Sequence, residues 1–106
     1  MSVTNNAVYL KAGANFGSGG DAWADKNSLY TPELKASIEA CYTQMLADGV
    51  LLEPVYATWD QDTFHLTIVK VVSSVAAYNA AVTFNVSEVV ADATAAGWTY
   101  VGSSTI

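Results

Sequence analysis

The sequence predicts a single α+β domain made of two similar halves, each consisting of a strand, a helix and a strand. In both halves, alternating strand-like segments flank apolar residues at helical spacing. In both, a glycine follows the predicted helix, as is common at helix C-termini. The chain has 106 residues, the size of one ordinary domain, so we assign residues 1–106 to one domain.

The first half begins with a strand in "NNAVYLKAG", where Val8 and Leu10 alternate with Tyr9 and Lys11. A glycine-rich loop follows over residues 13–30. Long loops in compact domains are often functional or mobile. The loop contains three aromatic residues, Phe16, Trp23 and Tyr30, which predict that it packs against the rest of the protein. It could form a lid over a cavity between the helices and the sheet, an arm across a second subunit, or simply an ordered loop.

The first predicted helix begins at Thr31-Pro32-Glu33. Threonine can cap a helix, proline suits its first position, and glutamate favours the positive end of its dipole. Its apolar face consists of Leu34, Ile38, Cys41, Tyr42 and Met45. Asp48-Gly49 ends it, and a strand over residues 50–59 completes the half.

The second half repeats this order. Residues 64–72 are rich in β-branched side chains and predict a strand. Ser73 or Ser74 can cap a short helix over residues 75–82. Asn85 or Ser87 can cap a second helical segment, whose apolar face consists of Val86, Val89, Val90 and Ala93. Gly97 ends that segment, and "WTYVGSST" predicts a closing strand.

The element order βαββαβ is the split βαβ arrangement called ferredoxin-like. Right-handed crossovers place the helices on one face of a four-stranded antiparallel sheet. The other face stays bare in a monomer, so its side chains must meet either water or a partner.

The hairpin "TWDQDTFH" predicts which side chains share a face, because a shift of one residue exchanges the two faces. A two-residue turn at Gln61-Asp62 would pair Trp59 with Phe64, and a four-residue loop gives the same parity. One face is then apolar: Val55, Ala57, Trp59, Phe64, Leu66 and Ile68. The other consists of Tyr56, Thr58, His65, Thr67, Val69 and Val71. A three-residue loop would mix the two sets.

This second face predicts a homodimer. It lacks the lysine and glutamate typical of a solvated sheet, and tyrosine suits an interface because it brings area and a polar tip. We therefore expect two copies to pack sheet to sheet about a twofold axis. The predicted dimer seam consists of Tyr9, Tyr56, Thr58, His65, Thr67 and Val69.

The segment "ATWDQDTFHLTIVKVVSSVAAYNAA" resembles the dimeric ferredoxin-like α+β barrel family. The likeness lies in a tryptophan ending strand two, an acidic turn, strand three and a serine-capped helix with an aromatic residue. Members include monooxygenases of polycyclic phenols, haem-degrading enzymes and ligand domains of transcription regulators. The chain lacks the haem-degrading motif and a DNA-binding segment. The resemblance implies a cavity between sheet and helices, lined here by Trp59 and Tyr42 with Tyr78 and Trp98 behind them.

Composition argues against several classes of partner. The net charge is −6, with four scattered lysines and no arginine, so we expect no nucleic-acid binding. No apolar run approaches the ~18 residues of a membrane span, so we expect no membrane association. The N-terminal residues do not resemble a secretory signal, and a single cysteine fits a reducing compartment, so we expect a cytoplasmic location.

The chemically versatile residues have ordinary explanations beside functional ones. His65 fits a dimer seam better than a metal site, since Asp60 and Asp62 at the turn lie too far along the strand. The two aspartates suit turn capping better than paired catalysis. Cys41 belongs to an apolar stripe, which favours an inert buried thiol over a nucleophile. We therefore expect no metal and no cofactor.

Two functional hypotheses remain open. The first is a dimeric module that binds a small apolar or aromatic molecule or serves self-association. The second is a cofactor-independent monooxygenase or isomerase acting on such a molecule in the sheet–helix cavity. A cavity large enough for a ligand, with Trp59 and one polar partner pointing into it, favours the second, whereas a cavity filled by Met45, Tyr42 and Val90 contradicts it.

Overall fold

The structure is a computed structural model that describes residues 3–15 and 29–105. The described residues form one four-stranded antiparallel sheet, in the order β2-β3-β1-β4, and three helices. The elements are β1 (Val3–Leu10), α2 (Pro32–Ala47), β2 (Tyr56–Asp60), β3 (His65–Val72), α3 (Val75–Ala81), α4 (Val86–Ala95) and β4 (Thr99–Thr105).

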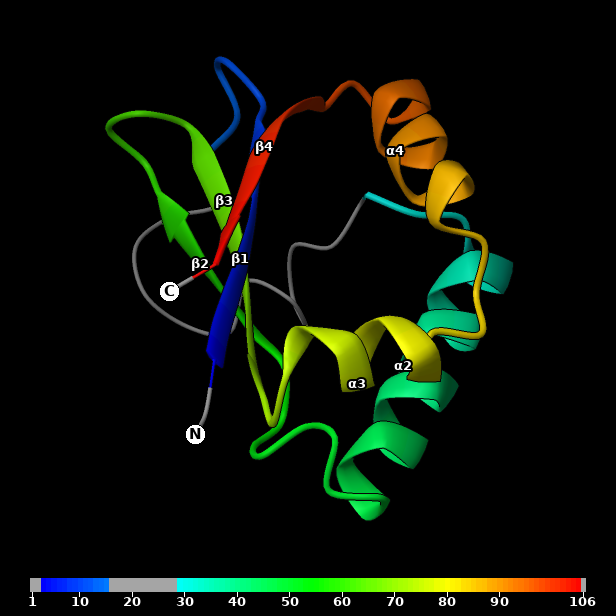
Figure 1. Cartoon of the computed structure of the whole chain (residues 1–106). Coiled ribbons are helices and arrows are strands. Elements are labelled where there is room, and N and C mark those ends of the chain that lie inside the picture. The colour runs from blue at the N-terminus through cyan, green and yellow to red at the C-terminus, as the bar shows by residue number, and fades with distance from the viewer. Residues whose placement is uncertain (1–2, 16–28, 106) are drawn as a thin grey trace.

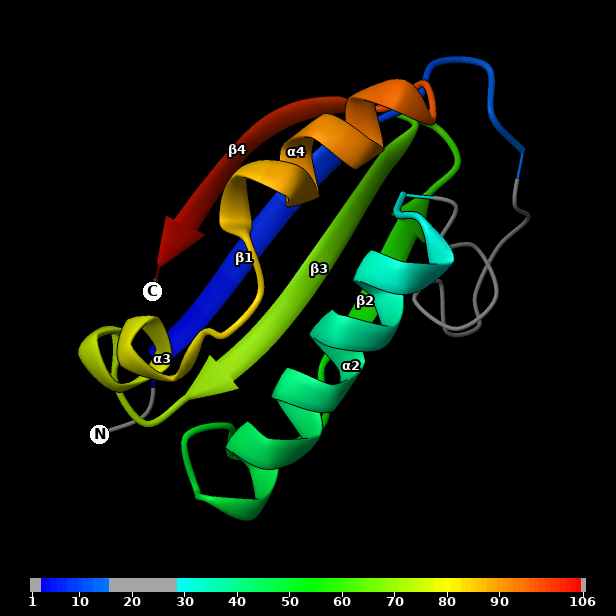
Figure 2. The ribbon, with the colours of Figure 1, turned by 90° about the vertical axis from the view of Figure 1, so that its right-hand side faces the viewer.

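The domain has two layers. All three helices lie on one side of the sheet, and none covers the other side (Figure 1). Viewed from the helix side, the helices form a layer in front of the strands (Figure 2). This α+β architecture is compatible with the ferredoxin-like arrangement, so the α+β class and the helices on one face are confirmed.

The predicted helix caps are present. The Thr31 hydroxyl accepts a hydrogen bond from the Leu34 amide at 3.3 Å. Ser74 and Asn85 cap α3 and α4 in the same way. At the C-termini of α2 and α4 the next glycines have φ angles of 77° and 94°, a conformation that favours glycine. Local sequence signals therefore set these helix boundaries.

The β2–β3 hairpin has the four-residue loop. Trp59 pairs with Leu66, and Phe64 lies in the loop with a φ angle of 60°. The two-residue alternative is therefore wrong, although the assignment of faces on β2 and β3 holds. The Asp60 carboxylate accepts hydrogen bonds from the Asp62 and Thr63 amides at 2.9 and 3.3 Å. These two bonds hold the pKa of Asp60 below its usual range.

Strand β2 is shorter than predicted, because it begins at Tyr56 rather than near residue 50. Leu51 makes only an isolated bridge with Val72, and Pro54 lies between this bridge and the strand. Proline has no amide hydrogen to donate to a neighbouring strand, which explains the interruption.

The placement of Tyr9 at the dimer seam is wrong. Tyr9 pairs with Leu66 on the helix-covered face and is only 2% exposed. Its neighbour Val8 pairs with Thr67 on the face of the sheet that no helix covers, which we call the open face. The alternation within β1 separates two sets of residues but does not show which set meets the helices. Pairing with β3 decides this.

The core lies between the sheet and the helices. Its largest fully buried side chains come from every layer: Leu29, Ile38, Met45, Leu51, Leu66, Val72 and Trp98. Leu29, near the end of the glycine-rich loop, packs in this core, with Tyr30 partly buried against it. Residues 16–28, on which the prediction of a lid or arm depends, lie outside the described residues.

Candidate functional site

A pocket of about 570 Å³ lies between the sheet and the helices. Every strand except β2 contributes to its walls, and so do all three helices. Five of the six tyrosines of the chain line it: Tyr9, Tyr30, Tyr42, Tyr78 and Tyr100. We call it the sheet–helix pocket. Its volume falls within the ~300–1,000 Å³ typical of small-molecule sites.

Lys70 is the polar residue that distinguishes this pocket. It lies on β3 between Val69 and Val71, and strand alternation turns it to the same face as Ile68 and Val72. Lys70 is 5% exposed and is the one charged side chain that is buried among the described residues. Lysine is almost never buried without a partner.

The Lys70 ammonium has no charged partner. Within residues 3–15 and 29–105, its Nζ makes no hydrogen bond or ion pair, and it lies 5.9 Å from the centroid of the Tyr78 ring. None of the described residues that line the pocket is a carboxylate. Burial disfavours the charged form and lowers the pKa of Lys70 to about 8. At neutral pH the pocket therefore contains a cation without a counterion among residues 3–15 and 29–105.

The tyrosines form hydrogen-bonded pairs around this cation. Tyr9 shares a side-chain hydrogen bond with Tyr30, and Tyr42 shares one with Tyr78. Burial is the largest cause that raises the pKa of each of these four phenols above its usual range. Their hydroxyls consequently stay protonated at neutral pH and can donate hydrogen bonds.

The remaining walls are mainly apolar. They include Ile38 on α2, Ile68 on β3, Phe84 and three valines of α4, which are Val86, Val89 and Val90. The Phe84 ring meets the Tyr42 ring edge to face, with the centroids 5.9 Å apart. The site thus combines aromatic and aliphatic walls, hydroxyl donors and one cation. Tyr42 and Val90 line the pocket but leave a volume of about 570 Å³, so they do not fill it. Trp59, which was expected to point into the cavity, is not part of the lining.

The four residues expected to line the cavity separate into two groups. Tyr42 and Tyr78 line the sheet–helix pocket, whereas Trp59 and Trp98 lie outside it. The two indoles pack edge to face with centroids 5.8 Å apart, and Trp59 Nε1 donates to the Gln61 side chain at 2.8 Å. Trp98 is 2% exposed, and the Lys11 ammonium lies 5.4 Å from its ring centroid. These tryptophans belong to the core beside the hairpin.

The other predicted seam residues lie on the open face. The pairing places Thr58 opposite Thr67 and Tyr56 opposite Val69, while Asp60 pairs with His65. Tyr56 is 42% exposed. Among the described residues, no three His, Cys, Asp or Glu side chains lie close enough to hold a metal ion.

Four residues that line the pocket were not predicted from the sequence to line a cavity: Tyr9, Tyr30, Lys70 and Tyr100. One signal for Lys70 was available: it has the same strand parity as Leu66 and Ile68, which were assigned to the helix-facing side. A lysine that continues an inward-facing set is a candidate for burial.

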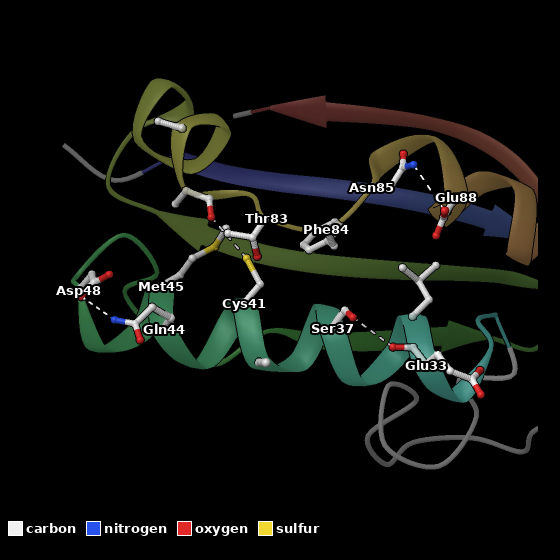
Figure 3. Close-up of a pocket in the computed structure, with 14 residues that line it drawn as sticks. Glu33, Ser37, Cys41, Gln44, Met45, Asp48, Thr83, Phe84, Asn85 and Glu88 are labelled. Atoms are coloured by element: carbon white, nitrogen blue, oxygen red, sulfur yellow. Dashed lines mark hydrogen bonds between the residues drawn. The ribbon is translucent and has the colours of Figure 1, made fainter.

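A second hollow, of about 860 Å³, lies between α2 and the segment that joins α3 to α4 (Figure 3). Its polar groups are largely bonded to one another. Gln44 donates to Asp48 at 3.0 Å, and the Cys41 thiol donates to the Ala81 carbonyl at 3.4 Å. Glu33 and Glu88 lie on its exposed side. It holds no buried charge, so the sheet–helix pocket is the better candidate.

Comparison of the chain with family models, curated proteins and solved structures gives no match. Within the described part of the chain, no helix is long and apolar enough to cross a membrane.

Replacing Lys70 by methionine is expected to stabilise the fold at pH 7. The shift in pKa from 10.5 to about 8 corresponds to a cost of up to about 3 kcal/mol for burying the charge. Methionine has similar length and no charge, so we expect a gain of about 1–3 kcal/mol in the free energy of unfolding. Chemical denaturation at a fixed protein concentration measures it.

This gain is expected to depend on pH. The unfolded chain retains the lysine proton up to a higher pH, so wild-type stability relative to Lys70→Met should rise between pH 8 and 10.5. The gain should therefore shrink over that range. Lys35→Met, outside the pocket, is the matched control and should change stability by less than about 0.5 kcal/mol. A Lys70→Met protein that is less stable than wild type at pH 7 would contradict the uncompensated charge.

Proposed function

We propose that the protein binds a small aromatic or apolar molecule that carries an anionic group, and that it does so in the sheet–helix pocket. One observation carries the proposal: Lys70 is buried there, and the described part of the chain gives it no counterion and no carboxylate in the pocket walls. A buried charge is costly unless it is paired, so a bound anion would compensate the charge of Lys70.

The rest of the pocket fits the rest of such a ligand. Phenol hydroxyls can donate hydrogen bonds to a carboxylate or phenolate that meets Lys70, because burial keeps these groups protonated. Phe84 and the α4 valines provide apolar surface for a ring. Aromatic and apolar walls with a few polar groups that fix orientation are typical of small-molecule sites.

A second candidate function is catalysis without a cofactor on a molecule of the same class. The observation that favours it is the combination of a lysine whose pKa lies at about 8 with tyrosines whose pKa values are raised. Groups with perturbed pKa values that share a pocket are the usual equipment of general acid–base chemistry.

We further propose that the protein is a homodimer through the open face of the sheet. The open-face residues of β1, β2 and β3 are threonine, valine, tyrosine, asparagine, leucine and histidine, with one carboxylate, Asp60, beside the turn. Tyr56 is 42% exposed in the single chain. A second copy would cover this surface, and a twofold axis would bring the same residues together from both copies.

Loss of the Lys70 charge should weaken binding of an anionic aromatic probe. We expect 2-naphthoate to bind the wild-type protein and to bind Lys70→Met at least tenfold more weakly, since charged hydrogen bonds contribute roughly 1.5–3 kcal/mol. Uncharged 2-naphthylmethanol should bind both proteins alike. Isothermal titration calorimetry measures all four affinities, and Lys35→Met serves as the matched control. Equal affinity of wild type and Lys70→Met for 2-naphthoate would refute the proposed role of Lys70.

A charge placed on the open face should dissociate the dimer. Thr67 lies on β3 and pairs with Thr58 across the hairpin and with Val8 on the other side. Thr67→Lys would bury an unpaired ammonium at the interface, so we expect a monomer at micromolar concentration, whereas wild type should sediment as a dimer. The matched control is Thr43→Lys on the exposed side of α2. A wild-type monomer, or a Thr67→Lys dimer, would contradict the proposed interface.

A further inference from the structure

Among the described residues that line the pocket, no anionic group faces the Lys70 amine, and its nearest aromatic contact given by the structure is the Tyr78 ring, whose centroid lies 5.9 Å from Nζ. The polar side chains that line the pocket come from every element packed against it and are all neutral near pH 7: the five tyrosines already named, Asn5 on β1, Asn79 on α3 and Ser103 on β4. The α4 side chains that line the pocket are valines. A buried lysine is usually held as a cation by a carboxylate, and none is present among the described residues of the lining.

Burial also increases the fraction of Lys70 side chains that are neutral amines at physiological pH. With a pKa of about 8, roughly one-tenth of the Lys70 side chains are unprotonated at pH 7. For an ordinary lysine the unprotonated fraction is smaller by a factor of ~200. Desolvation in a hydrophobic pocket is one of the known ways of activating a lysine as a nucleophile.

These observations deepen the proposed function and rest on it. We propose that Lys70 is an amine nucleophile that condenses with the carbonyl carbon of a small aromatic aldehyde or ketone in the sheet–helix pocket to form an imine. Lys70 is only 5% exposed and lines the pocket. It has no hydrogen-bond or ion-pair partner among the described residues. The same pocket therefore takes two kinds of aromatic molecule: an anionic one meets the protonated form of Lys70, and an aromatic carbonyl compound reacts with the neutral form.

The reaction balances without an oxidant, a reductant or a metal. The lone pair of the neutral Lys70 nitrogen forms a bond to the carbonyl carbon, and the electrons of the carbon–oxygen π bond move to the oxygen. The nitrogen loses a proton and the oxygen gains one, which gives a carbinolamine. Loss of the hydroxyl group as water, with loss of the second nitrogen proton, leaves the carbon–nitrogen double bond.

The tyrosines can supply the proton that the carbonyl oxygen gains when the carbinolamine forms. The Tyr78 ring centroid lies 5.9 Å from Lys70 Nζ, and Tyr78 shares a hydrogen bond with Tyr42. Burial raises the pKa of both phenols, so both remain proton donors under the conditions in which part of Lys70 is neutral. We assign them as positioning and proton-donating groups for the carbinolamine oxygen.

Reductive trapping tests this proposal. The protein is incubated at pH 7 with 2-naphthaldehyde and sodium cyanoborohydride, which reduces an imine to a stable secondary amine. Peptide mapping by mass spectrometry then follows the rate of labelling at each lysine. We expect Lys70 to be labelled at least tenfold faster than Lys35 of the same molecule, although Lys70 is the more buried of the two.

Two controls identify the pocket as the place of reaction. Excess 2-naphthoate should slow labelling of Lys70 and leave the rate at Lys35 unchanged, because it occupies the same pocket. Lys70→Arg retains a cation that can meet 2-naphthoate but has no nucleophilic amine, so it should lose the fast label. Lys70→Met should lose it as well, which covers the case in which the larger arginine does not fit.

The outcomes separate this inference from the proposed function. Labelling of Lys70 no faster than that of Lys35 would overturn the imine proposal. If 2-naphthoate binding still depends on Lys70 in that case, the pocket remains an anion-binding site and only the covalent step is wrong. If 2-naphthoate binding is also independent of Lys70, both proposals fail.

Discussion

The antiparallel pairing of β1 with β3 at the centre of the sheet is the constraint on which the rest of the structure depends. Paired residues point to the same face, so this register decides which side chains meet the helices. Tyr9 lies opposite Leu66, and Asn5 lies opposite Lys70. A shift of one residue would carry Tyr9 out of the core and Val8 into it. The tyrosine-lined pocket therefore exists only in this register.

The same register buries Lys70, which lowers the stability of the fold. The strand that places Leu66 and Ile68 in the core carries a lysine two residues further on, on the same face. Small domains are stable by only about 5–15 kcal/mol, so a buried charge without a counterion is a substantial loss. Proteins commonly retain such unfavourable groups where function requires them. This cost, together with the absence of carboxylates from the part of the lining that the structure describes, is the reason for proposing a ligand-binding role for the pocket.

Local patterns in the sequence predict much of this fold. The caps at Thr31, Ser74 and Asn85 and the glycines after α2 and α4 depend on neighbouring residues, and the structure confirms them. Hairpin parity also followed from side-chain type, although the loop length did not. The face of β1 could not be predicted, because alternation within one strand leaves its pairing partner undefined.

The pocket was less predictable than the fold. Its tyrosines come from segments far apart in the chain, from Tyr9 to Tyr100, and only the folded sheet and helices bring them together. Trp59 and Trp98 were expected there because of a family resemblance, but they pack edge to face beside the hairpin. Lysine is normally a surface residue, so no role was predicted for Lys70, although strand alternation places it on the same face as Leu66 and Ile68.

The proposed binding of an anionic aromatic molecule depends on Lys70 being buried as a cation, with no counterion among the described residues. NMR titration of protein labelled with carbon-13 lysine tests it most directly, with Lys70→Met used to assign the Lys70 signal. The expected midpoint for Lys70 is near 8, and bound 2-naphthoate should move it upward. A midpoint near 10.5 in the ligand-free protein, unmoved by 2-naphthoate, would contradict the claim.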